Sequence, residues 1–339
     1  MAENKAEPLV VIAADFSDEM IEKIRDSVPH MRVERHFPQV PEQLWPEVEI
    51  LYSIHTFPDP QAVPRLRWIQ MHMSGVNRIL SEPIAQSRDV TITTASGLHA
   101  GIIAEYSLMA MLAFSQKLLT MQEYQRKAEW PEARFEIFSR KPLRGQTLGI
   151  IGYGSIGREL ARMADALGMI VLASKRDVMH PADHDHYREA NMGDPEGEIP
   201  RRIYPPEATV SMVRECDFVV VLSPLTDKTN QNIGEEVFDA MKPTAYLINV
   251  ARGEVVDEDA LISALAAHKI AGAALDVFSE EPLPSTSPLW NLDNVIISPH
   301  IAGNREDYHD AVTDIFIENL RRYQENKPLL NLVKPDFGY

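Results

Sequence analysis

The sequence predicts an α/β protein whose two domains each contain a doubly wound parallel sheet. Its 339 residues are enough for two domains of ordinary size. Near-continuous apolar runs such as residues 219–222 suit strands buried on both faces, and they alternate with helical patterns along the chain. The third observation is a glycine motif at residues 152–157, between an apolar run and a helical pattern.

Residues 8–105 are expected to form a small α/β domain of their own. Ser17 is a candidate N-cap for a helix that reaches about Val28, with Ile21 and Ile24 on its inner face. The strand candidates are residues 9–13, 48–54, 66–71 and 90–94. Alternating strands and helices favour a parallel sheet, and this part of the chain carries no glycine motif.

Residues 104–128 have the longest helical pattern in the sequence. At ~1.5 Å per residue, one continuous helix would extend roughly 36 Å. Trp130 and Pro131 mark its end. A helix of this length could connect the two predicted domains.

The larger sheet is expected within residues 144–300. Its strand candidates are residues 148–151, 169–173, 218–222, 245–250, 271–275 and 295–298. The polar residues 177–206 between the second and third strands are interpreted as a surface insertion. His184 and His186 within it could bind a metal, but no third ligand is evident, so a solvated loop is preferred and no metal is predicted. Asn304 is a candidate cap for a last helix that reaches about Asn326.

The glycine motif predicts a Rossmann-like dinucleotide site. Gly152 permits a tight turn, Gly154 lets a pyrophosphate approach the backbone, and Gly157 lets the helix pack close to the strand. Ser155 and Ile156 begin the helix, whose free N–H groups favour phosphate. The alternative is a glycine-rich turn in an unrelated α/β domain.

Composition excludes some classes of partner. A net charge of −17 disfavours nonspecific binding to nucleic acid or to anionic membranes. The single cysteine, Cys216, precedes an apolar run, so we expect a buried structural thiol in a reducing compartment. The N-terminus has no apolar signal region, and no apolar run reaches membrane-spanning length, so a cytoplasmic protein is predicted.

Several motifs together resemble the D-isomer-specific 2-hydroxyacid dehydrogenase family. Besides the glycine motif they are Pro224-Leu225-Thr226 with Thr229, Met241-Lys242-Pro243, Asn249 to Gly253, Leu275 to Phe278 with Glu281-Pro282, and Ser298 to Gly303. The resemblance implies a discontinuous substrate domain (1–105 and 305–339), a cofactor domain (106–304) and an active site in the cleft between them. It also implies a homodimer in which the long helix and the segment around Trp130 take part.

Three residues match the family's catalytic positions. Arg252 offers a forked cation to a substrate carboxylate. His300 is the expected general acid/base, and Glu281 is expected to hydrogen-bond its imidazole and favour the charged form. The alternative for Arg252 is a surface ion pair, for His300 a core histidine, and for Glu281 a carboxylate in a turn. Glu280 is adjacent to Glu281, and only the family register selects Glu281.

The resemblance also assigns binding positions. Backbone amides at Ser74 and Gly75 are expected to bind the substrate carboxylate, together with Arg252 and His300, although a plain turn is the alternative. Leu98 and His99 could line the cleft. The implied cofactor-binding residues are Gly152, Gly154, Ser155, Ile156, Gly157, Ser174, Lys175, Arg176, Ser223, Pro224, Thr229, Val250, Ala251, Arg252, Asp276, His300 and Ala302. Asp276 is expected to hold the nicotinamide carboxamide, or else to cap its strand end.

Charge at the end of the second strand bears on the choice of cofactor. NAD enzymes usually place an acid there to bind the ribose 2′-hydroxyl. This chain has Ser174, Lys175 and Arg176, which suit a 2′-phosphate, and Asp177 would take the acid's place only if the turn shifted. NADP(H) is therefore favoured, with NAD(H) as the alternative.

The sequence as a whole predicts an NAD(P)H-dependent reductase of a small 2-keto acid such as glyoxylate or hydroxypyruvate. A nucleotide-sensing interaction protein similar to the C-terminal-binding corepressors is the alternative from another class, because such proteins keep the three catalytic residue types. A formate or phosphite dehydrogenase is a third possibility. Glu281 argues against formate, since formate enzymes have Gln at this position.

Overall fold

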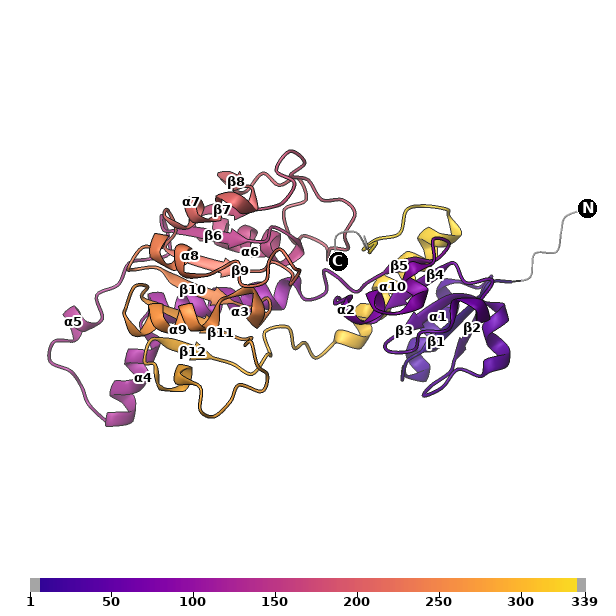
Figure 1. Ribbon diagram of the computed structural model, residues 1–339, viewed down its shortest axis with the longest axis horizontal. Helices are drawn as coiled ribbons and strands as arrows, with labels where there is room; N and C mark the ends of the chain where they lie inside the picture. Colours follow the sequence, from indigo (N-terminus) through magenta and orange to yellow (C-terminus); the bar gives the residue numbers. More distant parts are fainter. Residues whose placement is uncertain (1–6, 334–339) are drawn as a thin grey trace, which may run out of the picture. The chain divides into compact units, whose positions relative to one another are not determined.

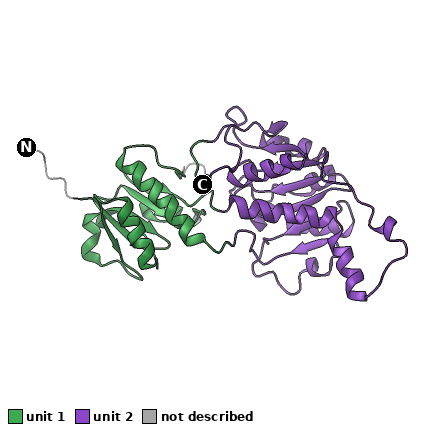
Figure 2. Cartoon of the chain, turned by 180° about the vertical axis from the view of Figure 1, so that it is seen from behind, with its two compact units in different colours: residues 1–98, 184–189, 305–339 green, residues 99–183, 190–304 purple. Residues whose placement is uncertain are grey.

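A computed structural model describes residues 7–333 and divides the chain into two compact units (Figure 2). Unit 1 consists of Met1–Leu98, His184–Glu189 and Arg305–Tyr339. Unit 2 consists of His99–Asp183 and Ala190–Asn304. Each unit has its own sheet, and all neighbouring strands within each sheet run parallel.

Unit 1 is built on a five-stranded sheet of order β2-β1-β3-β4-β5 (Figure 1). Its elements are β1 Leu9–Ala13, α1 Asp18–Ser27, β2 Arg32–Arg35, η1 Glu42–Glu47, β3 Val48–Ser53, η2 Pro60–Ala62, β4 Trp68–Met71, α2 Asn77–Leu80, η3 Pro83–Gln86, β5 Thr91–Thr93 and α10 Tyr308–Gln324. The expected strands are present, and β2 is a strand that sequence reasoning missed. Ser17 caps α1 as predicted, since its Oγ accepts from the Met20 N–H at 3.2 Å. Ile24 of α1 and Phe316 of α10 pack in the core on one face of this sheet.

Unit 2 is built on a seven-stranded sheet of order β12-β11-β10-β9-β6-β7-β8. Its elements are α3 Ala100–Ser115, α4 Leu118–Lys127, α5 Arg134–Ile137, β6 Thr147–Ile151, α6 Ser155–Ala166, β7 Ile170–Ser174, β8 Arg202–Tyr204, η4 Pro206–Ala208, α7 Thr209–Val213, β9 Phe218–Val221, α8 Glu235–Ala240, β10 Tyr246–Asn249, η5 Gly253–Val255, α9 Glu258–Ala266, β11 Gly272–Leu275, η6 Pro288–Asn291 and β12 Val295–Ile297. The chain leaves β6 toward β7 and β8, then returns to place β9 on the other side of β6. The carboxyl ends of β6 and β9 therefore form the switch point at which such sheets bind ligands.

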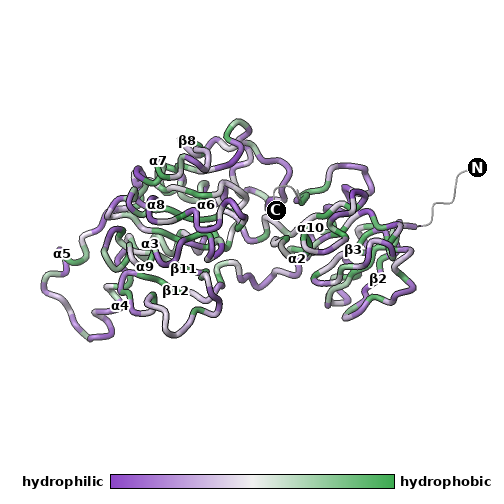
Figure 3. The backbone as a smooth tube through the Cα atoms, in the orientation of Figure 1, coloured by the Kyte–Doolittle hydropathy of each residue, from purple (hydrophilic) through white to green (hydrophobic). Residues whose placement is uncertain are grey.

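The continuous apolar runs are explained by the two helical layers of unit 2. Val219 and Val221 of β9 pack in the core that contains α7, α8 and α9, whereas Phe218 and Val220 pack in the core that contains α3 and α6. Successive side chains of one strand thus enter opposite cores, and both must be apolar. Figure 3 shows hydrophobic stretches alternating with hydrophilic ones along the chain.

The predicted single long helix is wrong, because the structure breaks it into α3 and α4, bent by 61°. Lys117 interrupts the helix with a left-handed φ of 58°, and its ammonium donates to the Ile137 carbonyl at 2.5 Å. Within residues 7–333 no single helix is long and apolar enough to cross a membrane. The bent pair passes that test by length and composition only, and half of the α3 side chains are buried in the protein.

Two other local predictions need correction. The last helix begins at Tyr308 after Asp307, not after Asn304. The insertion is not wholly a solvated loop, because it contains strand β8 and contributes His184–Glu189 to unit 1. Among the described residues no three His, Cys, Asp or Glu side chains are grouped as a metal site.

Candidate active site

The glycine turn joins β6 to α6 at the switch point. Gly152 has a φ of 106°, and a Cβ there would lie 2.7 Å from the main chain of Leu222 and Ser223. A Cβ on Gly157 would lie 2.6 Å from the Gly152 carbonyl oxygen. Both positions therefore need glycine for reasons internal to the fold.

Gly154 is different, and it indicates a ligand. A Cβ there would meet nothing within 4 Å, so no protein contact requires glycine at this exposed position. Gly154 is also the N-cap of α6 and offers no side chain to the free N–H groups of the first helical turn, to which Ser155 and Ile156 belong. A pyrophosphate that approached the backbone would account for both features.

The loop after β9 provides a second indication. The Ser223 hydroxyl is buried, and no described residue hydrogen-bonds its Oγ. A buried hydroxyl without a hydrogen-bond partner destabilises the fold unless a ligand or water forms that hydrogen bond. Thr229 shapes the same loop, since its hydroxyl donates to the Pro224 carbonyl at 2.6 Å and accepts from the Thr226 N–H at 2.8 Å. The residues present thus fit a dinucleotide along β6 and β9.

The residues at the end of β7 differ in burial and in their contacts. Ser174 is buried and Arg176 is exposed. The Lys175 ammonium donates to the carbonyls of His180 at 2.7 Å and Pro181 at 3.2 Å. Burial, and then the charge of Arg158, lowers the pKa of Lys175. Asp177 accepts from the N–H groups of Met179 and His180 and pairs with the His180 ring at 2.9 Å, so its own turn occupies it.

Arg252 is positioned by the carboxyl end of β10. The Asn249 side chain accepts from the Ala251 N–H at 3.1 Å and donates to the Arg252 carbonyl at 3.1 Å, which fixes the turn. Val250 and Ala251 are buried, whereas Arg252 is exposed. Its Nη1 donates to the Ala251 carbonyl at 2.7 Å. The next position, 253, requires glycine, because a Cβ there would lie 1.9 Å from the Phe278 carbonyl carbon.

His300 and Glu281 form a hydrogen-bonded pair. His300 Nδ1 lies 2.7 Å from Glu281 Oε2, and the Phe278 N–H donates to Glu281 Oε1 at 3.1 Å. Glu280 has no such contact among the described residues. Burial alone would raise the pKa of Glu281, but hydrogen bonds from His300 and Phe278, together with the charges of His300 and Arg252, lower it overall. The structure thus brings Arg252, Glu281 and His300 into one electrostatic cluster at the ends of β10, β11 and β12.

Asp276 lies just after β11 and is only 1% exposed. Its carboxylate accepts from the Ser298 hydroxyl at 2.5 Å, the Ile301 N–H at 2.9 Å and the Ala302 N–H at 2.8 Å. These contacts correspond to the alternative role considered for Asp276 in the sequence analysis, a cap at the end of its strand. They place Ala302 against Asp276 as part of the loop that carries His300.

Ser74 and Gly75 belong to unit 1, in the loop between β4 and α2, and the Ser74 hydroxyl donates to the Ala95 carbonyl at 3.1 Å. Leu98 is buried in unit 1, whereas His99 begins unit 2. Sequence reasoning missed His72, a buried histidine two residues before Ser74 whose Nδ1 lies 2.5 Å from the Tyr52 hydroxyl. The signal in the sequence that could have identified His72 is its position directly after a predicted strand.

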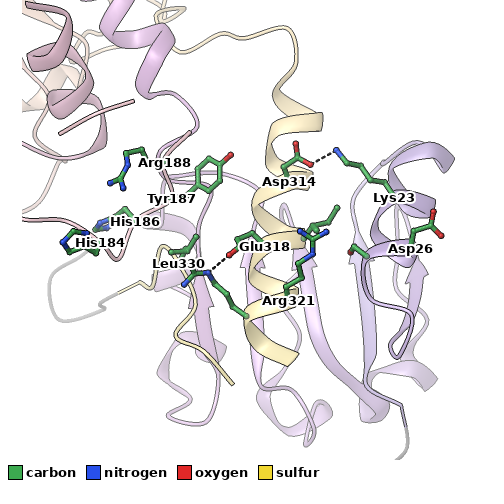
Figure 4. Close-up of a pocket in the computed structure, with 13 residues that line it drawn as sticks. Lys23, Asp26, His184, His186, Tyr187, Arg188, Asp314, Glu318, Arg321 and Leu330 are labelled. Carbon is green, nitrogen blue, oxygen red and sulfur yellow. Dashed lines mark hydrogen bonds and ion pairs between the residues drawn. The ribbon is translucent and has the colours of Figure 1, made fainter. Parts of the chain in front are cut away.

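A pocket of about 690 Å³ lies elsewhere, over α1 and α10 of unit 1 (Figure 4). The 184–188 segment of the insertion forms one wall. None of the predicted site residues lines it. Four of its charged side chains are paired, Lys23 with Asp314 at 2.5 Å and Arg322 with Glu318 at 2.8 Å.

Comparisons with known proteins identify the family of this chain. Residues 108–302 match the family model described as D-isomer specific 2-hydroxyacid dehydrogenase, NAD binding domain. A glyoxylate reductase of Thermococcus gammatolerans is 32% identical over 286 residues, which cover 81% of this chain and 80% of that protein. An (S)-sulfolactate dehydrogenase of Chromohalobacter salexigens is 32% identical over 266 residues, with 78% of each chain covered.

A crystal structure of a D-isomer specific 2-hydroxyacid dehydrogenase from Xanthobacter autotrophicus, in complex with NADPH and MES, is also similar. Its TM-score is 0.77 at 26% identity, and the match covers 98% of this chain and 100% of that chain. The family model covers more than half of the chain, and the curated relatives exceed 30% identity over most of it. The chain therefore belongs to the D-isomer-specific 2-hydroxyacid dehydrogenases, enzymes that interconvert 2-keto and 2-hydroxy acids with a nicotinamide cofactor.

Proposed function

We propose that this chain reduces a small 2-keto acid, such as glyoxylate or hydroxypyruvate, with His300 as the general acid. The observation that carries the proposal is the 2.7 Å contact between His300 and Glu281 beside Arg252. The match to relatives named glyoxylate reductase supports the substrate class.

Each residue of the cluster has a distinct role in this proposal. Because Nδ1 of His300 is bonded to Glu281, Nε2 is left to protonate the carbonyl oxygen as its π bond breaks. A bound nicotinamide supplies the hydride that forms the new C–H bond at C2. The Glu281 carboxylate stabilises the protonated imidazole, and the exposed Arg252 guanidinium holds the substrate carboxylate.

The direct test is NADPH and NADH oxidation with a panel of 2-keto acids. Turnover is expected, and His300→Ala should lower kcat by about 10²- to 10⁴-fold, the range for loss of a general acid. Cofactor affinity, measured by NADPH fluorescence, should be largely retained. If the wild-type protein binds NADPH but turns over no member of the panel, the nucleotide-sensing alternative replaces the enzyme.

We further propose that the amides of Ser74 and Gly75 bind the substrate carboxylate. A Gly75→Pro variant lacks the amide hydrogen at that position. It should raise KM for the keto acid and leave NADPH affinity unchanged. An unchanged KM would exclude the Gly75 amide as a ligand.

NADP(H) remains the proposed cofactor, for two reasons. The Asp177 carboxylate is hydrogen-bonded to Met179 and His180 of its own turn, so it is not directed toward a ribose hydroxyl. Arg176 is exposed at the strand end. NADPH should therefore give the higher kcat/KM, and a preference for NADH would contradict the proposal.

A homodimer is proposed as well. Trp130 is 83% exposed and Phe135 is 80% exposed on the α4–α5 part of unit 2, and Leu118 is also exposed. Large exposed apolar side chains gathered in one part of the chain are typical of an interface. Light scattering should give the mass of a dimer for the wild type, and a Trp130→Glu/Phe135→Glu variant should give the mass of a monomer.

A further inference from the structure

Side chains of α3 and of Asp276 hold the loop that carries His300. We propose that Tyr106 and Ser298, acting through the buried carboxylate of Asp276, are positioning residues for His300. This inference rests on the proposed function, because it concerns the geometry of the proposed general acid.

Asp276 organises the loop of residues 298–302. Its carboxylate receives three hydrogen bonds from this loop, and its main-chain oxygen accepts a fourth, from the His300 N–H at 2.8 Å. A carboxylate with two oxygens has about four acceptor sites, so most of its capacity is used by the loop. The conformation of the loop therefore depends on Asp276.

The backbone of His300 needs this support. Its φ of 54° lies in the left-handed region, a strained conformation that a non-glycine residue keeps only where its surroundings impose it. Bonds to Asp276 from His300 itself and from its neighbour Ile301 impose it here. If these bonds weaken, the backbone can relax and the imidazole can leave Glu281.

Tyr106 extends the network from α3. Its hydroxyl lies 2.5 Å from Ser298 Oγ. Ser298 has one hydroxyl hydrogen, and this hydrogen is directed to the acceptor-only carboxylate of Asp276. Tyr106 must therefore donate to Ser298, which polarises the Ser298 hydroxyl toward Asp276. Burial chiefly raises the pKa of Tyr106. The hydrogen bond with Ser298 lowers this pKa and the charge of Asp276 raises it, but the net shift is upward, so the phenol keeps the proton that it donates.

A second contact ties the other end of the loop to the start of α3. His99 Nδ1 lies 3.0 Å from the carbonyl oxygen of Gly303. The segment before α3 and the helix itself thus contact both ends of the loop, at Gly303 and at Ser298. The hydroxyl of Tyr106 is the contact whose removal changes the shape of the protein least.

The experiment compares Tyr106→Phe, Ser298→Ala and Ser298→Thr, with Tyr246→Phe as the control. Tyr246 belongs to the same unit, where its ring stacks on Phe114 at 4.4 Å, but within residues 7–333 its hydroxyl forms no hydrogen bond to the His300 loop. The measurements are kcat, KM for NADPH and keto acid, the pH profile of reduction, and the melting temperature. Wild-type turnover in the same assay tests the proposed function separately.

Tyr106→Phe and Ser298→Ala should lower kcat by about 10- to 100-fold, the effect of misplacing a catalytic group, with KM for NADPH within about twofold. The midpoint of the pH profile should move in both variants, and Ser298→Thr, which keeps the hydroxyl, should restore both quantities. A Tyr106→Phe variant that matches Tyr246→Phe in kcat and pH midpoint would overturn the inference. If Tyr106→Phe does not fold, the comparison of Ser298→Ala with Ser298→Thr tests the inference instead. Equal kcat values for these two variants would also overturn the inference.

If the wild-type protein has no turnover, the proposed function fails, but the positioning role is still measurable. The imidazole of His300 can be observed by ¹⁵N NMR, with His300→Gln to assign its signals. The pH midpoint of this titration should differ between wild type and Tyr106→Phe, whereas Tyr246→Phe should match the wild type. Identical titrations in all three proteins would refute the positioning role independently of activity.

Discussion

His72 should make unit 1 sensitive to mild acid. It follows β4 directly, is 5% exposed and hydrogen-bonds the buried Tyr52 hydroxyl at 2.5 Å. Burial, followed by the charges of His309 and His55, lowers its pKa from 6.5 to about 4. The unfolded chain therefore takes up this proton at a higher pH than the folded chain does, and folding loses stability as pH falls below about 6.5.

The size of the effect follows from the shift. About 2.5 pKa units at ~1.4 kcal/mol per unit gives a limit of about 3.5 kcal/mol, reached only below the folded pKa of about 4. At pH 5 the unfolded imidazole is mostly protonated and the folded one is not, so the expected loss relative to pH 7.5 is about 2 kcal/mol. At pH 5 most carboxylates remain ionised, which keeps this contribution separate from general acid unfolding.

Urea unfolding at pH 7.5 and pH 5 measures this loss. The chain has four tryptophans, and Trp130→Phe/Trp290→Phe leaves only Trp45 and Trp68, both in unit 1, as fluorescence reporters. His72→Asn in this background keeps an acceptor near Tyr52 but cannot be protonated, so it should lose about 2 kcal/mol less than its parent between the two pH values. His30→Asn, at an exposed site of the same unit, is the matched control and should keep the pH dependence of the parent. The reasoning is refuted if His72→Asn and its parent lose the same stability.

Three further predictions concern the site of unit 2. The Glu281 carboxylate is ionised at neutral pH because its pKa is lowered, so Glu281→Gln should remove the charge that favours protonated His300. The pH at which ketone reduction falls to half its maximum should then move downward, and an unchanged profile would remove Glu281 from the mechanism. Arg176→Gln should lower kcat/KM with NADPH by about 10-fold or more, as expected for one hydrogen bond between charged groups, while NADH activity stays near the wild-type value; a parallel loss with both cofactors would show that Arg176 does not contact the 2′-phosphate. Burial chiefly raises the pKa of the Cys216 thiol to about 12, so iodoacetamide at pH 8 should alkylate Cys216 in urea but not in the folded protein, as mass spectrometry would show.

Sequence reasoning was most successful where the physical cause is local. The turn at Gly152 needs a positive φ, and the run from Val219 to Val221 needs apolar residues because both faces of β9 are covered. Ser17 caps α1 through a bond to a residue three positions away. In each case the signal that predicts the structure is a short pattern of neighbouring residues in the sequence.

Contacts that depend on how loops fold could not be predicted in this way. Lys175 appeared suited to a phosphate, but its ammonium is bound to the carbonyls of His180 and Pro181. Glu281 was chosen over Glu280 only through the family register, because nothing local distinguishes two adjacent carboxylates. The break at Lys117 was missed because no glycine or proline marks it; a contact with Ile137 accompanies it.

The insertion shows why polar composition is a poor guide to order. Its residue Asp194 is 5% exposed, and its carboxylate accepts from the Tyr153 hydroxyl at 2.5 Å and from the N–H groups of Gly197, Glu198 and Ile199. Arg158, buried in α6, donates to the main-chain oxygens of Asp194 and Pro181. A polar segment remains exposed to solvent only when its polar groups have no hydrogen-bond partners within the protein. Here two residues of the cofactor-binding region, Tyr153 and Arg158, supply those partners, so the insertion is held by the same turn and helix that form the glycine site.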